Sequence, residues 1–74
     1  MTKARERFVH LAEARTRKAI KLIRLIGNLS NQSNYSYSGE DIDKIFRTLR
    51  KELKAAQDRF AEQHEERRDV DFSL

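Results

Sequence analysis

The sequence has 74 residues, of which 38% are charged, with a formal net charge of +4 and neither cysteine nor proline. A chain of this length forms at most one domain. Its apolar core is barely sufficient unless regular helix packing or a second subunit supplements it. The absence of cysteine excludes disulfides, thiolate metal sites and cysteine nucleophiles. Abundant alanine, leucine, lysine, arginine and glutamate favour long helices.

Hydropathy along the chain argues against a membrane protein. No apolar run approaches the roughly 18 residues that span a bilayer. The first seven residues are followed by alternating polar and apolar positions, so a secretory signal is not expected. The cytoplasm is therefore the expected location.

The first part of the chain carries apolar residues at alternating spacings of four and three, which is the pattern of a heptad seam. These residues are Phe8, Ala12, Ala19, Leu22, Ile26 and Leu29, with Arg15 at the one polar step. The pattern predicts a helix over about residues 3–28, with Thr2 as its N-cap. We expect this helix to end at Gly27 or Asn28 in a left-handed closing turn, which these residue types favour.

An uncharged segment, 29–38, separates the first helix from a second one and is predicted to be a loop. Asn-x-Ser triplets begin at residues 28, 31 and 34, and we interpret them as turn-forming residues rather than glycosylation sites. A capping box follows, in which Ser38 caps a helix over about 39–66 and Asp41 reaches back to the Ser38 N–H. The second seam consists of Ile42, Phe46, Leu49, Leu53, Ala56, Phe60 and Gln63.

The two seams match when the second helix folds back antiparallel to the first. The pairs are Leu29–Ile42, Ile26–Phe46, Leu22–Leu49, Ala19–Leu53, Arg15–Ala56, Ala12–Phe60 and Phe8–Gln63, whose residue numbers always add to 71 or 72. Small residues face large ones, which fills such layers without voids. The predicted fold is therefore all-α, an antiparallel two-helix hairpin over residues 1–66.

Arg15, the polar member of the first seam, is open to two interpretations. Its aliphatic stem can lie over Ala56 while its guanidinium pairs with Glu52 or Glu13 at the edge of the seam. Alternatively, the guanidinium binds a ligand. We favour the first interpretation, because a lone polar seam residue more often fixes register.

Further apolar residues lie off the seam, where one hairpin cannot cover them. The candidate self-association or partner surface consists of Val9, Ile20, Ile23, Leu25 and Ile45. Between Ala19 and Ile26 only Lys21 and Arg24 are polar, as in a helix that is buried on several sides. Pairing of two hairpins into a four-helix bundle homodimer is the favoured cover, and burial against a different protein is the alternative.

The last residues, 67–74, are predicted to be a flexible tail. Val70, Phe72 and Leu74 alternate with polar residues, so a short extended segment that docks on the bundle or on a partner is the alternative interpretation.

Basic residues form a stripe on the face of the first helix opposite its seam. The stripe consists of Lys3, Arg7, Arg17, Lys21 and Arg24, and no acidic residue falls on its spacing. A second basic surface consists of Lys44, Arg47, Lys51 and Lys54 on the second helix. Such surfaces can follow a phosphate backbone, although a solvated helix face has the same appearance. Aromatic residues between the basic ones and a base-reading motif are both missing.

No residue pattern in the sequence is typical of catalysis or of cofactor binding, so an enzyme is not expected. His10 and His64 with Glu62 or Glu65 could hold a metal ion once the hairpin closes, but we interpret them as ordinary surface residues. The function that we predict is a small interaction module that self-associates as a helical bundle. A bundle that binds RNA or DNA through its basic stripe and acts as a regulator is the alternative.

Three short runs, residues 15–20, 27–31 and 43–46, resemble short bacterial helical-hairpin proteins without known activity, some of them on mobile elements. This resemblance covers residues 5–60. In architecture the chain is also similar to the Rop-type plasmid regulator, a small hairpin that dimerises into a four-helix bundle and binds RNA. Here the loop is longer than in that regulator and no sequence run matches, so none of its RNA-contact residues is assigned to this chain. A likeness of fold alone implies little about function.

Overall fold

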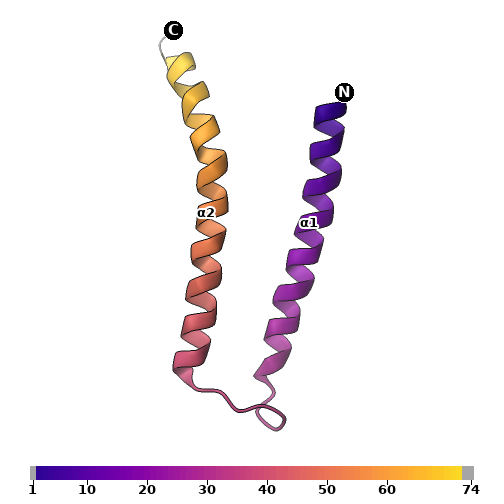
Figure 1. Ribbon diagram of the computed structural model, residues 1–74, viewed down its shortest axis with the longest axis vertical. Coiled ribbons are helices and arrows are strands. Elements are labelled where there is room, and N and C mark those ends of the chain that lie inside the picture. Colours follow the sequence, from indigo (N-terminus) through magenta and orange to yellow (C-terminus); the bar gives the residue numbers. More distant parts are fainter. Residues whose placement is uncertain (1, 73–74) are drawn as a thin grey trace. The chain divides into compact units, whose positions relative to one another are not determined.

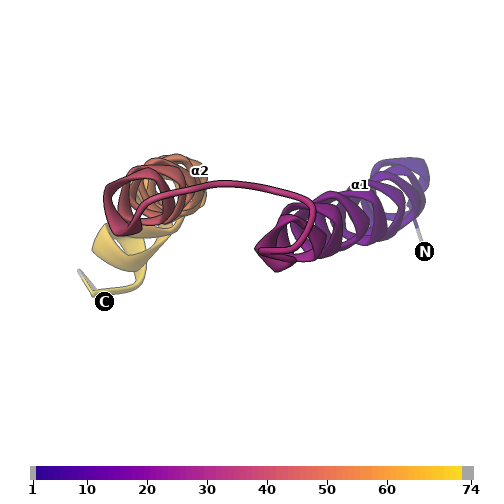
Figure 2. The ribbon, with the colours of Figure 1, turned by 90° about the horizontal axis from the view of Figure 1, so that it is seen from below.

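The computed structural model describes the backbone of residues 2–72 and the side chains of residues 2–63. Its elements are α1 (Lys3–Gly27), the short 3₁₀ helix η1 (Asn28–Ser30) and α2 (Gly39–Phe72), shown in Figure 1 and from below in Figure 2. Strands are absent from the described residues. The predicted all-α class with two long helices is therefore confirmed. The chain divides into two units, 1–36 and 37–74, which we describe one at a time.

The start of α1 is fixed by Thr2, as predicted. Thr2 has an extended backbone, and its side-chain oxygen accepts a hydrogen bond from the Arg5 N–H at 3.1 Å. Its carbonyl accepts the N–H of Glu6 at 3.0 Å. These bonds satisfy donors that the first turn of a helix otherwise leaves unpaired. Glu6 in the first turn and Arg24 in the last turn both complement the helix dipole.

The end of α1 differs from the predicted closing turn. The α-helix ends at Gly27 as expected, but the left-handed conformation was a wrong prediction, because no described residue has a positive φ. Asn28 has φ −65° and ψ −18°, and its N–H bonds to the carbonyl of Arg24. The chain thus stays right-handed and tightens into η1, a common way for the last turn of a helix to satisfy its carbonyls.

The segment between η1 and α2 contains a turn built on Asn31. The Asn31 carbonyl accepts hydrogen bonds from the N–H groups of Asn34 and Tyr35, at 3.1 and 3.0 Å. Its side-chain oxygen accepts from the N–H and the hydroxyl of Ser33, at 3.1 and 2.6 Å. An asparagine side chain that bonds two residues ahead is a common turn device. The interpretation of this asparagine as a turn-forming residue is confirmed.

The capping box at the start of α2 is also confirmed. The Asp41 N–H donates to the Ser38 hydroxyl oxygen at 3.1 Å, and the Ser38 N–H donates to the Asp41 carboxylate at 2.9 Å. The hydrogen bonds from the backbone and the side chain of Ser38 hold the pKa of Asp41 below its ordinary value of 3.8, and the charge of Lys44 acts in the same direction. The carboxylate form of Asp41 is therefore the form that stabilises this helix end.

Acid is expected to weaken the capping box as Asp41 becomes protonated, at a pH below that at which an ordinary aspartate is protonated. Because the pKa of Asp41 is lower in the folded chain, its stabilisation is complete above the unfolded value of 3.8 and is lost as the pH falls through the folded pKa. Circular dichroism during an acid titration should show this loss in the wild type and not in Asp41→Asn. Asp43→Asn removes the same charge two residues further along the helix and should behave as the wild type does. Equal acid sensitivity in Asp41→Asn would contradict this role, and Ser38→Ala should independently destabilise α2 by about 1 kcal/mol.

The far end of α2 lies beyond its predicted limit. The helix continues past residue 66 to Phe72, so the backbone of 67–72 is helical where the sequence suggested a tail. Glycine and proline are absent from this segment, and no residue in it interrupts a helix sterically. The side chains of Val70 and Phe72, and Leu74 as a whole, lie outside the described residues. In the part of the chain that is described, no helix holds an apolar stretch long enough to cross a bilayer.

Candidate functional site

Apolar side chains of α1 are exposed on both sides of its predicted seam. Ile20 and Ile23 are 42% and 52% exposed, one turn apart on one flank, and Val9 is partly buried on the same flank. Leu25 is 51% exposed and lies about half a turn from Ile23, on the opposite flank beside Leu11. The predicted surface on α1 is therefore two apolar flanks on either side of the seam.

The seam of α1 is itself open to solvent. Its largest members, Phe8 and Leu22, are exposed by about one half, whereas Ala12 and Ile26 are partly buried. The guanidinium of Arg5 lies over the Phe8 ring at 5.7 Å from the ring centroid, a cation–π contact within this helix. No described side chain of the chain is fully buried. The seam and the two flanks together form an apolar band around more than half of α1.

On α2, apolar side chains follow the predicted seam from the first turn onward. Ile42, Phe46 and Leu49 are partly buried, as is Ile45, the remaining member of the candidate surface. Further along, Leu53 is 64% exposed and Phe60 is 59% exposed. A helix that presents large apolar residues at this spacing is stabilised mainly when another element covers them.

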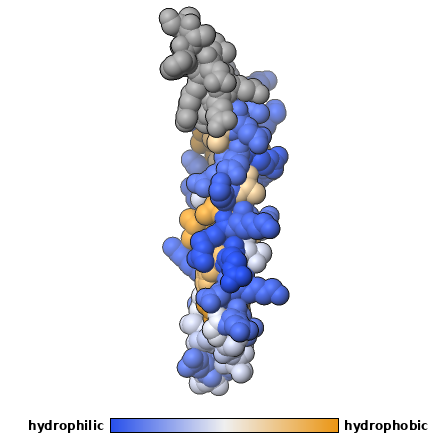
Figure 3. Space-filling view, turned by 90° about the vertical axis from the view of Figure 1, so that its left-hand side faces the viewer, coloured by the Kyte–Doolittle hydropathy of each residue, from blue (hydrophilic) through white to orange (hydrophobic). Residues whose placement is uncertain are grey.

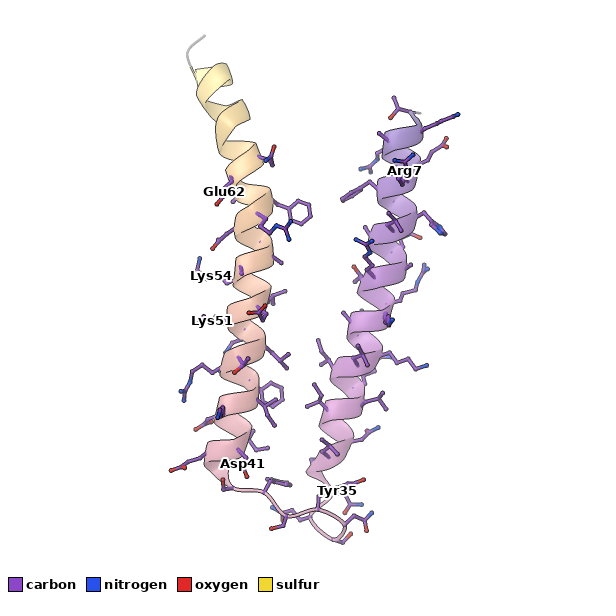
Figure 4. All side chains as sticks on the ribbon, in the orientation of Figure 1. Arg7, Tyr35, Asp41, Lys51, Lys54 and Glu62 are labelled. Atoms are coloured by element: carbon purple, nitrogen blue, oxygen red, sulfur yellow. The ribbon has the colours of Figure 1, made fainter. Side chains whose placement is uncertain are left out.

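The basic stripe of α1 divides into two parts. Lys3 and Arg7 lie near its start, and Arg17, Lys21 and Arg24 lie near its end. Figure 4 labels Arg7. His10 and Ala14 occupy the stripe positions between these two parts, so the stripe has no lysine or arginine over about 15 Å of the helix. The Arg17 guanidinium also lies 3.4 Å from the Glu13 carboxylate.

This ion pair changes two expectations from the sequence. An acidic group lies against the stripe, although none falls on its spacing. In addition, Glu13 pairs with Arg17, one turn along the helix, and not with Arg15. Both side chains of the pair are more than half exposed, so it contributes little to stability, but it does lower the local positive charge.

The basic surface of α2 occupies one face of the helix. Lys44, Arg47, Lys51 and Lys54 are all exposed, at spacings of three and four residues. Figure 4 shows Lys51 and Lys54 on the same side of α2, and Figure 3 shows this face as largely hydrophilic. The Lys54 ammonium lies 3.2 Å from the carboxylate of Asp58, which ends the basic run.

Neither of the two ion pairs was predicted from the sequence. Each joins residues four apart on one helix, Glu13 with Arg17 and Lys54 with Asp58. Opposite charges at this spacing are neighbours on a helix surface, so a search for such pairs would have found them.

Side chains that could bind a metal ion do not cluster among the described residues. None of their acidic and histidine side chains form a group of three or more that could hold a metal ion. A hollow on α1 is lined by Ala12, Glu13, Thr16 and Arg17, all from one helix surface. Comparisons with protein-family models, with curated proteins and with solved structures find no match for this chain.

Proposed function

We propose that this chain is a small, non-enzymatic interaction module that self-associates as a helical bundle. The observation that carries the proposal is the exposure of large apolar side chains, above all Ile20, Ile23 and Leu25, on helices that otherwise carry many charges. Complete burial of one such side chain contributes about 1.5–3 kcal/mol. Packing of another element against the apolar band on α1 would therefore strongly stabilise the fold.

In this proposal, α2 of the same chain packs against the seam of α1. The seams match in one antiparallel register, in which Ala19 faces Leu53 and Ala12 faces Phe60. Complementary sizes support this register, because a shift of one layer would place large residues opposite each other and leave voids elsewhere. Arg15 over Ala56 would fix the register as its one polar layer.

A second copy of the chain then packs against apolar residues that the hairpin leaves exposed. A hairpin uses one side of each helix, so Ile20 and Ile23 on one flank of α1 and Leu25 on the other remain. Two hairpins side by side supply matching flanks, since a two-fold interface brings the same surface of both copies together. Four antiparallel helices then enclose one core, the arrangement of many small helical bundles. Ile45 extends the same core on α2.

Ile23→Glu tests this surface, with Ala14→Glu as its matched control. Both substitutions add one negative charge to α1, but Ala14 lies on the polar face and Ile23 on the apolar flank. Because a carboxylate at an apolar interface loses its hydration without a partner, Ile23→Glu should convert the dimer to monomers. Ala14→Glu should keep the wild-type mass in sedimentation equilibrium.

The outcome separates the two candidate partners. A dimer mass retained by Ile23→Glu would overturn the assignment of this flank. A wild-type chain that is helical and monomeric at all concentrations would overturn self-association and leave a different protein as the cover.

A further inference from the structure

The basic face of α2 carries a high and undivided positive charge. We define this face by Lys44, Arg47, Lys51 and Lys54. Residues 44–54 contain five basic residues and one acidic residue, Glu52. Glu52 lies about a quarter turn or more from the members of the face, and Asp43 lies at its start, one turn before Arg47, so no acidic residue falls on the face between Lys44 and Lys54. Five basic residues and one acidic residue give this segment a net charge of +4, equal to that of the whole chain.

The face also has the geometry of a linear contact. Its four residues span about 15 Å along the helix, at 1.5 Å per residue, and stay within a narrow arc of the helix surface. Lys51 and Lys54 project from the same side of α2 in Figure 4. Lys54 is paired with Asp58, but both are more than half exposed, and such pairs exchange easily with another anion. Lys44, Arg47 and Lys51 make no ion pair with any described residue.

This face lies away from the apolar residues of its own helix. Leu49 and Leu53 in the seam of α2 are about half a turn from Lys51. Pairing through the seam therefore leaves the basic face accessible, and self-association would present one such face per copy. The stripe on α1 is less suitable, because His10 and Ala14 interrupt it. The ion pairs do not distinguish the two surfaces, since each surface carries one exposed ion pair.

We infer that the basic face of α2 binds the phosphate backbone of a nucleic acid without reading its sequence. Lysine and arginine neutralise phosphates and release condensed counterions, which supplies most of non-specific affinity. Aromatic residues are absent from the face, since Phe46 belongs to the seam, so bases have no side chain to stack on. Single-stranded and duplex forms should therefore both bind, with an affinity set by salt.

Fluorescence anisotropy with a labelled RNA of about 20 nucleotides and a DNA duplex of equal length tests this inference. With four phosphate contacts per copy, the slope of log K against log salt for the duplex should be about −3.6. Lys44→Glu with Lys51→Glu should weaken binding at least about tenfold and reduce the size of the slope by about 2.

The control is the double variant Lys3→Glu with Arg7→Glu on α1. Each substitution changes the charge by −2, so both double variants go from a net charge of +4 to zero. Under the inference, only the α2 variant loses most of its affinity. Equal losses in both variants, a greater loss in the α1 variant, or no binding even at about 50 mM salt would overturn it. Binding confined to vesicles that contain phosphatidylserine would also overturn it, in favour of a lipid surface.

The nucleic-acid binding test is independent of the proposed self-association. Sedimentation mass and circular dichroism of both double variants should match the wild type, because the four residues lie on polar faces. Loss of nucleic-acid binding with unchanged mass supports the inference, whatever the oligomeric state of the wild type.

Discussion

Truncating Leu53 to alanine is expected to lower the free energy of unfolding by about 2–5 kcal/mol, and adding Ala19→Leu to the same chain should restore part of the loss. Leu53 is 64% exposed on α2. On an unpaired helix its truncation would have almost no effect, because alanine is the better helix former. A large loss therefore requires that another element covers Leu53, and the proposed register assigns Ala19 to that position.

The double variant tests the register itself. Ala19→Leu alone should also destabilise, by about 1–3 kcal/mol, because the layer already holds a large residue. Urea denaturation at one fixed protein concentration then gives the interaction energy of the two positions as a departure from additivity. Ala14→Leu, on the polar face of α1, is the control and should not rescue Leu53→Ala. Strict additivity of Ala19→Leu and Leu53→Ala would contradict the register.

Replacing Arg15 by leucine is expected to stabilise the chain, by an amount on the order of 1–4 kcal/mol. Arg15 holds the one polar step of the first seam, opposite Ala56 in the proposed register. Its charge loses hydration when the seam closes, and Glu13, one of its two expected partners, lies against Arg17 instead. A leucine removes that penalty and adds apolar area to the layer.

The same substitution should reduce the specificity of the assembly. A lone polar residue in a seam selects one register and one oligomeric state, so Arg15→Leu should give a broader mass distribution in sedimentation. Arg17→Leu, on the outer face, is the control and should change neither the urea midpoint nor the mass by much. A fall in stability with Arg15→Leu would contradict this expectation and show that the guanidinium makes a favourable contact within the folded protein, such as an ion pair with Glu52.

Local features of the fold were predictable from the sequence because they depend on residues within one or two turns. Thr2 caps α1, and Ser38 and Asp41 form the capping box of α2, as their spacing indicated. The hand of the turn after Gly27 was not predictable in this way. Glycine permits a left-handed residue without requiring one, and here the chain tightens into η1.

The end of α2 was also not predicted, because the helix extends beyond the limit expected from the sequence. Residues 67–74 were predicted to be a flexible tail, with an extended segment as the alternative because Val70 and Phe72 alternate with polar residues, whereas the backbone continues as a helix to Phe72. A period of two over so few residues is a weak signal beside the high helix propensity of the preceding turns, because helices propagate once nucleated.

The candidate surfaces were predictable as faces of single helices. Ile20, Ile23 and Leu25 are exposed side chains of α1, and the basic residues of both surfaces are exposed as well. Sequence spacing on one helix cannot determine which other element covers such a face, because that depends on contacts far apart in the chain or between chains. The antiparallel register, the bundle and the likeness to Rop-type hairpins are accordingly proposals.

Sedimentation equilibrium of the wild-type chain over a range of micromolar concentrations tests the central proposal most directly. The chain has a mass of 8.8 kDa, and self-association through its apolar flanks predicts a species of twice that mass, with helical circular dichroism throughout. A helical species that remains at 8.8 kDa at every concentration would contradict the proposal.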